Sequence, residues 1–236
     1  IAPGVTEIEI QAYAEYQMGK LGGESPAIRS AIRSGPRGAS HHAPPTRRKF
    51  LQGDLVWVDF SGSYNRYHAD IARTHSIGQP DPRWVDLIKR SAGSVEAIQA
   101  EIKPGDPMRK LQEVGDRYID SQGIRKHVWW VGGYAMGIAI PPDWVGHVFF
   151  GGDGFEEMNF EPGMTLNWEN VFDVTKEDWR GGKGASFIEM LLIIDLTCGY
   201  NRYVQGLQAD QEEKPFGEGA EADRAASCGG PAIRPS

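Results

Sequence analysis

The stretch DLVWVDFSGSYNRYHADIART, residues 54–74, decides the fold and points to the chemistry. Trp57 and Asp59 alternate with other residues, so in a strand they share one face. Turn-forming residues at 62–65 predict a hairpin that returns Asp70 opposite Asp59. Taken alone, two acids beside a turn are typical of a solvated hairpin, because Asp and Asn favour turns for their own reasons. The alternative is that the hairpin aims both carboxylates at one metal site.

The composition limits the kind of protein. The chain has 236 residues, of which 40% are hydrophobic, enough for a globular domain with a substantial core. Acidic residues outnumber basic ones, 32 to 25, and the net charge of −7 argues against nucleic acid as a partner. No stretch approaches the roughly 18 apolar residues of a membrane span, and no signal-like segment opens the chain. We therefore expect a cytoplasmic protein that has no membrane partner.

A helix is expected near the start of the chain. Thr6 and Glu9 have the spacing of a capping box, and Gly22 follows the last helical position. The helix should run to about Leu21. Its candidate buried positions are Ile8, Tyr13, Tyr16 and Met18.

The remaining patterns predict the fold class. Helical periodicity covers 82–102 and 107–121, whereas short apolar runs broken by glycine predict strands at 128–140, 164–172 and 187–196. A helix, a hairpin, two helices and then more strands is the order of an α+β protein. The sheet should be antiparallel, because alternating βαβ units are missing from this order.

The two ends of the chain differ from its middle. From residue 208 onward large apolar side chains almost disappear, so 208–236 is expected to be a disordered, acidic and glycine-rich tail. Residues 1–207 then form the folded domain. Because the chain begins with Ile1 instead of methionine, we expect it to be a fragment.

Two later acids share a property of Asp59. Glu169 interrupts the apolar run 164–172, and Glu189 interrupts the run 187–194. A carboxylate inside an apolar strand is costly to desolvate unless it is paired. Several such acids would repel one another unless a cation lay between them, and divalent ions are the natural occupants. The alternative for either glutamate alone is an outward-facing position on a half-exposed strand.

Taken in order, these motifs resemble the creatinase, aminopeptidase P and methionine aminopeptidase group, whose pita-bread domain belongs to the M24 peptidases. The resemblance covers roughly residues 3–207. Its landmarks are the aspartate pair with PGVTEIEI at 3–10, HAPP at 42–45, GGYAMG at 132–137, EPGMTLNWEN at 161–170 and FIEMLLI at 187–193. The resemblance implies a curved antiparallel sheet covered by helices, a homodimer, and the absence here of the amino-terminal domain of full-length relatives.

The resemblance also implies a site and a reaction. Two divalent ions, manganese, cobalt or zinc, would be held by four acids: Asp59, Asp70, Glu169 and Glu189. Such ions would activate a bridging water and polarise the scissile carbonyl, with Glu169 also moving a proton. The implied substrate is a small peptide or small amide, cleaved at a C–N bond as by an Xaa-Pro dipeptidase or aminopeptidase.

The chain departs from the family at two histidines. Tyr134 stands where the family has its histidine ligand, and Pro141 stands where peptidases of the family place a substrate-contacting histidine. Neutral tyrosine is a poor ligand for these metals, so one ion position should be weakened. Tyr134 is either a pocket aromatic with a hydrogen-bonded hydroxyl or a catalytic hydroxyl aimed at the substrate. A tyrosine here, followed by Pro-Pro-Asp-Trp, resembles the ectoine-hydrolase-like branch.

Other side chains are candidates for contacts with the substrate. The resemblance assigns His42 to substrate binding and proton donation, with His41 as the substitute if the loop is one residue longer. His68 could share the face of Asp70 or be a structural strand histidine. His147 is a candidate replacement for a lost imidazole. Trp144 is a candidate for one wall of the substrate pocket.

Two other functions compete with a metallopeptidase. The surviving acids and His42 could catalyse metal-independent hydrolysis of a small molecule, as in creatinase-like and ectoine-hydrolase-like members. Alternatively, the loss of both imidazoles could have left a catalytically inactive pita-bread binding module.

Overall fold

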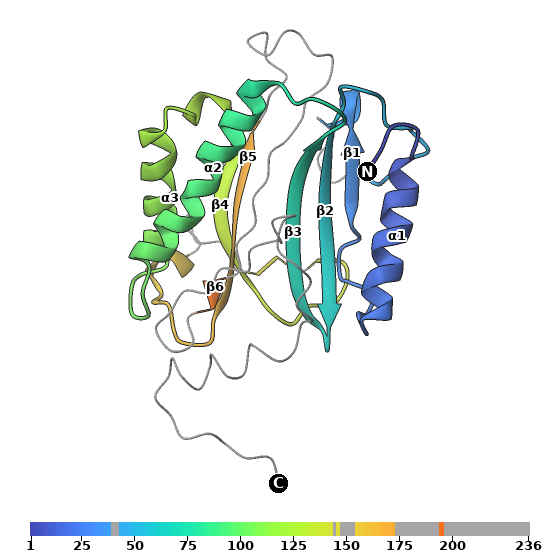
Figure 1. The fold of residues 1–236 in the computed structure, drawn as a ribbon. Coiled ribbons are helices and arrows are strands. Elements are labelled where there is room, and N and C mark those ends of the chain that lie inside the picture. The colour runs from blue at the N-terminus through green and yellow to red at the C-terminus, as the bar shows by residue number, and fades with distance from the viewer. Residues whose placement is uncertain (39–42, 144, 147–153, 173–193, 196–236) are drawn as a thin grey trace, which may run out of the picture.

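The computed structural model describes residues 1–38, 43–143, 145–146, 154–172 and 194–195 (Figure 1). Outside these ranges lie four of the predicted site residues: His42, Trp144, His147 and Glu189. The expected tail at 208–236 also lies outside them, so the division at residue 207 stays a prediction. Among the described helices, none is both long and apolar enough to cross a membrane.

The described strands form two three-stranded antiparallel sheets. The first has the order β1-β2-β3, with β1 at Ala31–Ser34, β2 at Leu55–Tyr64 and β3 at Tyr67–Ser76. The second has the order β4-β5-β6, with β4 at Val128–Met136, β5 at Thr165–Phe172 and β6 at Ile194–Asp195. Helices lie on the outer sides, with α1 beside the first sheet and α2 and α3 beside the second (Figure 1). The α+β class predicted from the sequence is confirmed.

Helix α1, Glu7–Lys20, begins at the predicted capping box. The Glu9 amide donates to Thr6 Oγ1 at 3.2 Å, and the Thr6 amide donates to Glu9 Oε2 at 2.7 Å. The expectation that Tyr13 and Tyr16 are buried is wrong, because their side chains are 64% and 61% exposed. Ile8, also expected inside, is 40% exposed, whereas Met18 is half-buried.

A polar anchor holds α1 in addition to an apolar contact, in which Ile10 packs against the core cluster of the first sheet. The Glu7 carboxylate is fully buried and accepts hydrogen bonds from Ser34 Oγ at 2.7 Å and from the Thr46 amide at 2.9 Å. It also pairs with Arg37. The helix is therefore oriented by the donors around Glu7, which turns both tyrosines outward.

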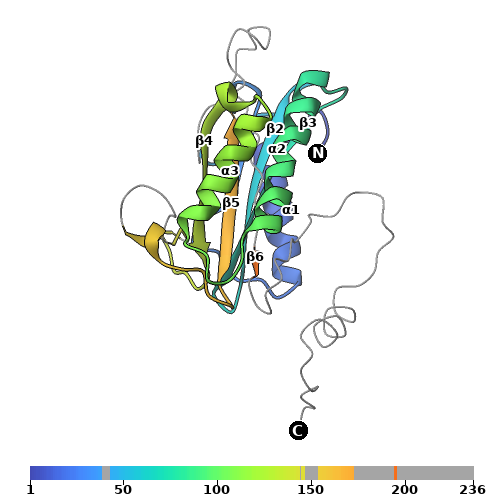
Figure 2. The same cartoon turned by 90° about the vertical axis from the view of Figure 1, so that its left-hand side faces the viewer.

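Helices α2, Pro82–Glu101, and α3, Arg109–Ser121, cover the outer face of the second sheet (Figure 2). Their apolar side chains meet alternate residues of β5 in the largest core cluster. Trp168 is fully buried there, and its Nε1 donates to Ser94 Oγ at 3.2 Å. Because alternate residues of a strand point to opposite faces, this packing leaves Asn167 and Glu169 on the inner side.

Gly115 of α3 leaves the space that Trp168 fills. A Cβ atom at Gly115 would overlap the indole ring, which has no room to retreat. We expect Gly115→Ala to lower the free energy of unfolding by about 1–3 kcal/mol despite the better helix propensity of alanine, because overpacking a tight core is costly. Denaturant unfolding measures the change.

Gly93 of α2 supplies the matched control. A Cβ atom there would meet the hydroxyl end of Tyr118, a half-buried side chain that can swing aside. Gly93→Ala should therefore be neutral or stabilising by up to about 1 kcal/mol. Equal losses of unfolding free energy in both variants would show that Gly115 is not packed more tightly against Trp168 than Gly93 is against Tyr118.

Candidate functional site

The hairpin of β2 and β3 places both aspartates on one face of the first sheet. Its turn is the pair Asn65 and Arg66, with φ of 49° and 66°, so the strands continue past the turn expected at 62–65. Asp70 therefore lies opposite Ser61, and Asp59 lies opposite Ala72. The expectation that the two aspartates face each other directly is wrong. They are diagonal neighbours on one face, which still brings their carboxylates near each other.

Both carboxylates lie in the interior between the two sheets. Asp59 is 6% exposed and Asp70 is 2% exposed. Val171, on the inner side of β5, packs with Trp57 and Ala72 of the first sheet, so the inner faces of the two sheets meet. Charged groups in such an interior need partners of opposite charge or protons, because desolvation disfavours the charged form.

The second sheet contributes Glu169 and Tyr134 to this interior. Glu169 lies opposite Gly132, and Tyr134 lies opposite Asn167. The Tyr134 ring is 4% exposed and packs against Ala27 and Met136. Tyr134 therefore has the buried packing expected of a pocket aromatic, and its hydroxyl faces the acids.

The Tyr134 hydroxyl connects Asp70 with Glu169. It lies 3.1 Å from Asp70 Oδ2 and still closer to Glu169 Oε1, which also accepts from Asn167 Nδ2 at 2.9 Å. A phenol has one proton, so it can donate to only one of the two carboxylates at a time. Because two carboxylates so close to one oxygen repel each other, a further proton or a cation would stabilise the arrangement.

The oxygen atoms that meet in this interior suit a divalent ion in chemistry but only partly in arrangement. Within the described ranges, no group of three or more His, Cys, Asp or Glu side chains is arranged to hold a metal. Carboxylate oxygens nevertheless suit hard and borderline divalent ions, and Asp59 and Asp70 present theirs from one face. The Tyr134 hydroxyl takes the space between Asp70 and Glu169. The donor set therefore fits one ion beside the aspartates better than two.

Arg33 is a charged residue of this interior that the sequence interpretation missed. Arg33 lies in β1 opposite Trp57 of β2 and is 2% exposed. Because Trp57 and Asp59 are two residues apart on one face of β2, Arg33 lies on the same face of the sheet as Asp59. Its guanidinium carbon lies 3.5 Å from the centre of the Trp57 ring, a cation–π contact. Strand alternation from Ala31 to Arg33 shows which face the Arg33 side chain lies on only when the pairing of β1 with β2 is known. Arg33 places a fixed positive charge in an otherwise acidic interior.

His68 has a structural role. Its Nε2 accepts from the Ala27 amide at 2.9 Å, and Nδ1 lies 2.9 Å from the Arg66 carbonyl oxygen. Since the amide can only donate, the ring proton belongs on Nδ1 and is donated to that oxygen. Both nitrogens thus bind backbone, which favours the structural alternative for this histidine.

Of the predicted site residues that are described, four come together: Asp59, Asp70, Tyr134 and Glu169. Residues 1–203 match the model of metallopeptidase family M24. The chain belongs to this family. The family recognised from the order of the motifs is thereby confirmed.

Individual relatives of this M24 chain cover it only in part. It is 29% identical to an Xaa-Pro dipeptidase of Pyrococcus furiosus over 140 residues, 59% of this chain and 40% of that protein. It is 27% identical to an ectoine hydrolase of Halomonas elongata over 202 residues, 82% of this chain and 47% of that protein. The M24 chain thus spans less than half the length of these two relatives.

Solved structures confirm the fold of the M24 chain. The prolidase from Pyrococcus furiosus superimposes with a TM-score of 0.71 at 22% identity, over 88% of this chain and 58% of that one. At this identity the likeness shows the fold alone, and that fold is the pita-bread arrangement expected from the sequence.

Proposed function

We propose that this protein hydrolyses a C–N bond in a small peptide or small amide, as an Xaa-Pro dipeptidase-like enzyme that uses metal-activated water. The observation that carries the proposal is the meeting of Asp59, Asp70 and Glu169 between the inner faces of an M24 fold. The names of two relatives, an Xaa-Pro dipeptidase and an ectoine hydrolase, support hydrolysis and leave the substrate class open.

The acids would have different roles. Asp59 and Asp70 would hold a divalent ion, manganese, cobalt or zinc, together with Glu169 and with Glu189, which lies outside the described residues. A bound ion of this kind lowers the pKa of water and polarises a carbonyl. Glu169 would accept the proton of the attacking water and return it to the leaving nitrogen.

Neighbouring groups would prepare Glu169 for this role. Asn167 donates to the oxygen of Glu169 that the Tyr134 hydroxyl also contacts, so two hydrogen bonds fix the carboxylate. Arg33 would offset part of the negative charge of the interior. We further propose a homodimer, as the family resemblance implies, with His42, Trp144 and His147 at the substrate. We also propose a cytoplasmic location, as the sequence patterns led us to expect.

Metal-independent hydrolysis is the second candidate function, and one observation favours it. The Tyr134 hydroxyl occupies the space between Asp70 and Glu169, where it can share a proton with either acid. A proton-sharing group of this kind can support general acid–base chemistry without a Lewis acid.

Hydrolysis assays on the purified chain separate the two candidates. We expect cleavage of Xaa-Pro dipeptides or cyclic amidines after loading with manganese, cobalt or zinc, and loss of most activity after exhaustive treatment with EDTA. Full activity after EDTA would support the metal-independent mechanism instead. No cleavage of either substrate class, with or without metal, would contradict both and leave a binding module.

A further inference from the structure

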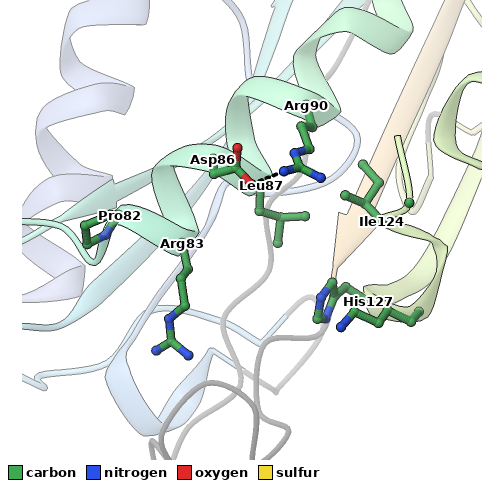
Figure 3. Close-up of a pocket in the computed structure, with 9 residues that line it drawn as sticks. Pro82, Arg83, Asp86, Leu87, Arg90, Ile124 and His127 are labelled. Carbon is green, nitrogen blue, oxygen red and sulfur yellow. Dashed lines mark ion pairs between the residues drawn. The ribbon is translucent and has the colours of Figure 1, made fainter. Parts of the chain in front are cut away.

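A cavity lies between the first half of α2 and residues 123–127 (Figure 3). Its volume is about 500 Å³. Small-molecule sites in proteins range over roughly 300–1,000 Å³, so the cavity is large enough for a ligand of modest size.

The lining of this cavity is cationic. Arg83, Arg90 and Lys126 contribute three positive charges and Asp86 one negative charge, a formal balance of +2. The whole chain carries −7, so the sign of this surface opposes that of the protein. Asp81 binds Arg83 from outside the lining and reduces the local excess without reversing it. Such a surface attracts anions.

The two arginines are held in place before any ligand arrives. Arg83 donates to Asp81 through Nε at 3.1 Å and Nη2 at 2.8 Å. Arg90 pairs with Asp86 at 2.9 Å and donates to the Gln122 carbonyl oxygen at 3.1 Å. Their side chains remain 39% and 45% exposed, so both can meet a ligand. Fixed donors lose less conformational entropy on binding, which favours affinity.

Apolar side chains form the deeper part of the cavity. Leu87 is 2% exposed and projects from α2, and Ile124 is 4% exposed and comes from the segment that follows α3 (Figure 3). The imidazole of His127, 8% exposed, also lines the cavity. An apolar surface beside a cationic one suits a ligand that has an apolar body and one anionic group.

The cavity is distinct from the acidic site. His127 comes directly before β4, whereas Tyr134 lies seven residues further along. At about 3.3 Å per residue, this length of strand separates the two places by roughly 20 Å. The acids also occupy the inner side of the sheets, and α2 lies on the outer side.

We propose that this cavity binds a small organic anion, a carboxylate or a phosphate monoester carried on an apolar body. Arg90 and Lys126 bind the anionic group, and Leu87 and Ile124 contact the body. Arg–carboxylate and Arg–phosphate contacts are charge-assisted and can be bidentate, so they provide most of the selectivity for anions. This site is independent of the proposed hydrolysis.

Calorimetric titration of the full chain tests the proposal with four probes: phenyl phosphate, benzoate, inorganic phosphate and benzyl alcohol. We expect phenyl phosphate or benzoate to bind at least about tenfold more tightly than inorganic phosphate and benzyl alcohol, because only these two combine charge and ring. The preferred one of the two identifies the anionic group. Equal affinity for all four probes, or no binding, would overturn the proposal.

Three variants then place the ligand. Arg90→Gln and Lys126→Gln should each weaken binding of the preferred probe by about tenfold. Lys89→Gln removes an exposed charge from the same helix outside the lining and should leave the affinity unchanged. Lys126→Gln serves as an independent test, because Arg90→Gln also removes the hydrogen bond to the Gln122 carbonyl oxygen. A loss with Lys89→Gln equal to that of both cavity variants would show attraction by overall charge and contradict a site.

Discussion

Glu169→Gln is expected to lower kcat for C–N bond hydrolysis on the order of a thousandfold, with a much smaller change in KM. The amide keeps the size of the side chain and its place opposite Gly132, but it cannot accept a proton from water. Steady-state kinetics on an Xaa-Pro dipeptide, with the Tm measured in parallel, separates this loss from unfolding.

Glu161 provides the control for this variant. It is exposed and lies in the turn before β5, so Glu161→Gln removes one carboxylate near Glu169 in sequence without touching the interior. We expect its kcat to equal that of the unaltered protein. Full activity in the Glu169→Gln variant would show that Glu169 takes no part in catalysis.

Tyr134→His is expected to raise the number of tightly bound divalent ions from about one per chain to about two. The imidazole would replace a neutral phenol at the place where one oxygen now lies between Asp70 and Glu169. An imidazole is a strong ligand for manganese, cobalt and zinc, whereas a protonated phenol is weak. Metal analysis after loading and gel filtration gives the stoichiometry directly.

Tyr134→Phe is the matched control for the histidine variant. It keeps the ring packed against Ala27 and Met136 but removes the hydroxyl. Since phenylalanine offers no ligand atom, the second ion should stay absent. A second ion in both variants would mean that loss of the hydroxyl alone opens the position. Two ions in the unaltered protein would show that Tyr134 does not weaken the centre.

Features set by short sequence patterns were predictable. The alternation around Asp59 placed both aspartates on one face, because the side-chain direction in a strand has a period of two. The capping box of α1 was predictable because Thr6 and Glu9 lie within one helical turn of each other. The ordered motifs that resemble the M24 peptidases also indicated the fold before any contact was known.

Features that depend on distant partners were not predictable. The hairpin register follows from the left-handed conformations of Asn65 and Arg66, which a run of turn-forming residues leaves undecided. The buried side of α1 follows from donors around Glu7, and two of these donors lie far along the chain. Arg33 gains its importance only when the two sheets meet, whereas Tyr134 already stood out in the sequence at the histidine position of the family.

The metal content of the purified protein tests most directly whether the acids of the two inner faces form a hydrolytic metal site. We expect about one divalent ion per chain after manganese loading, and a loss of this binding in Asp70→Asn, because the amide cannot replace a charged ligand. Asp86→Asn, on the outer helix α2, should keep the metal. No bound ion in the unaltered protein, or equal binding in Asp70→Asn, would contradict a metal site at these acids.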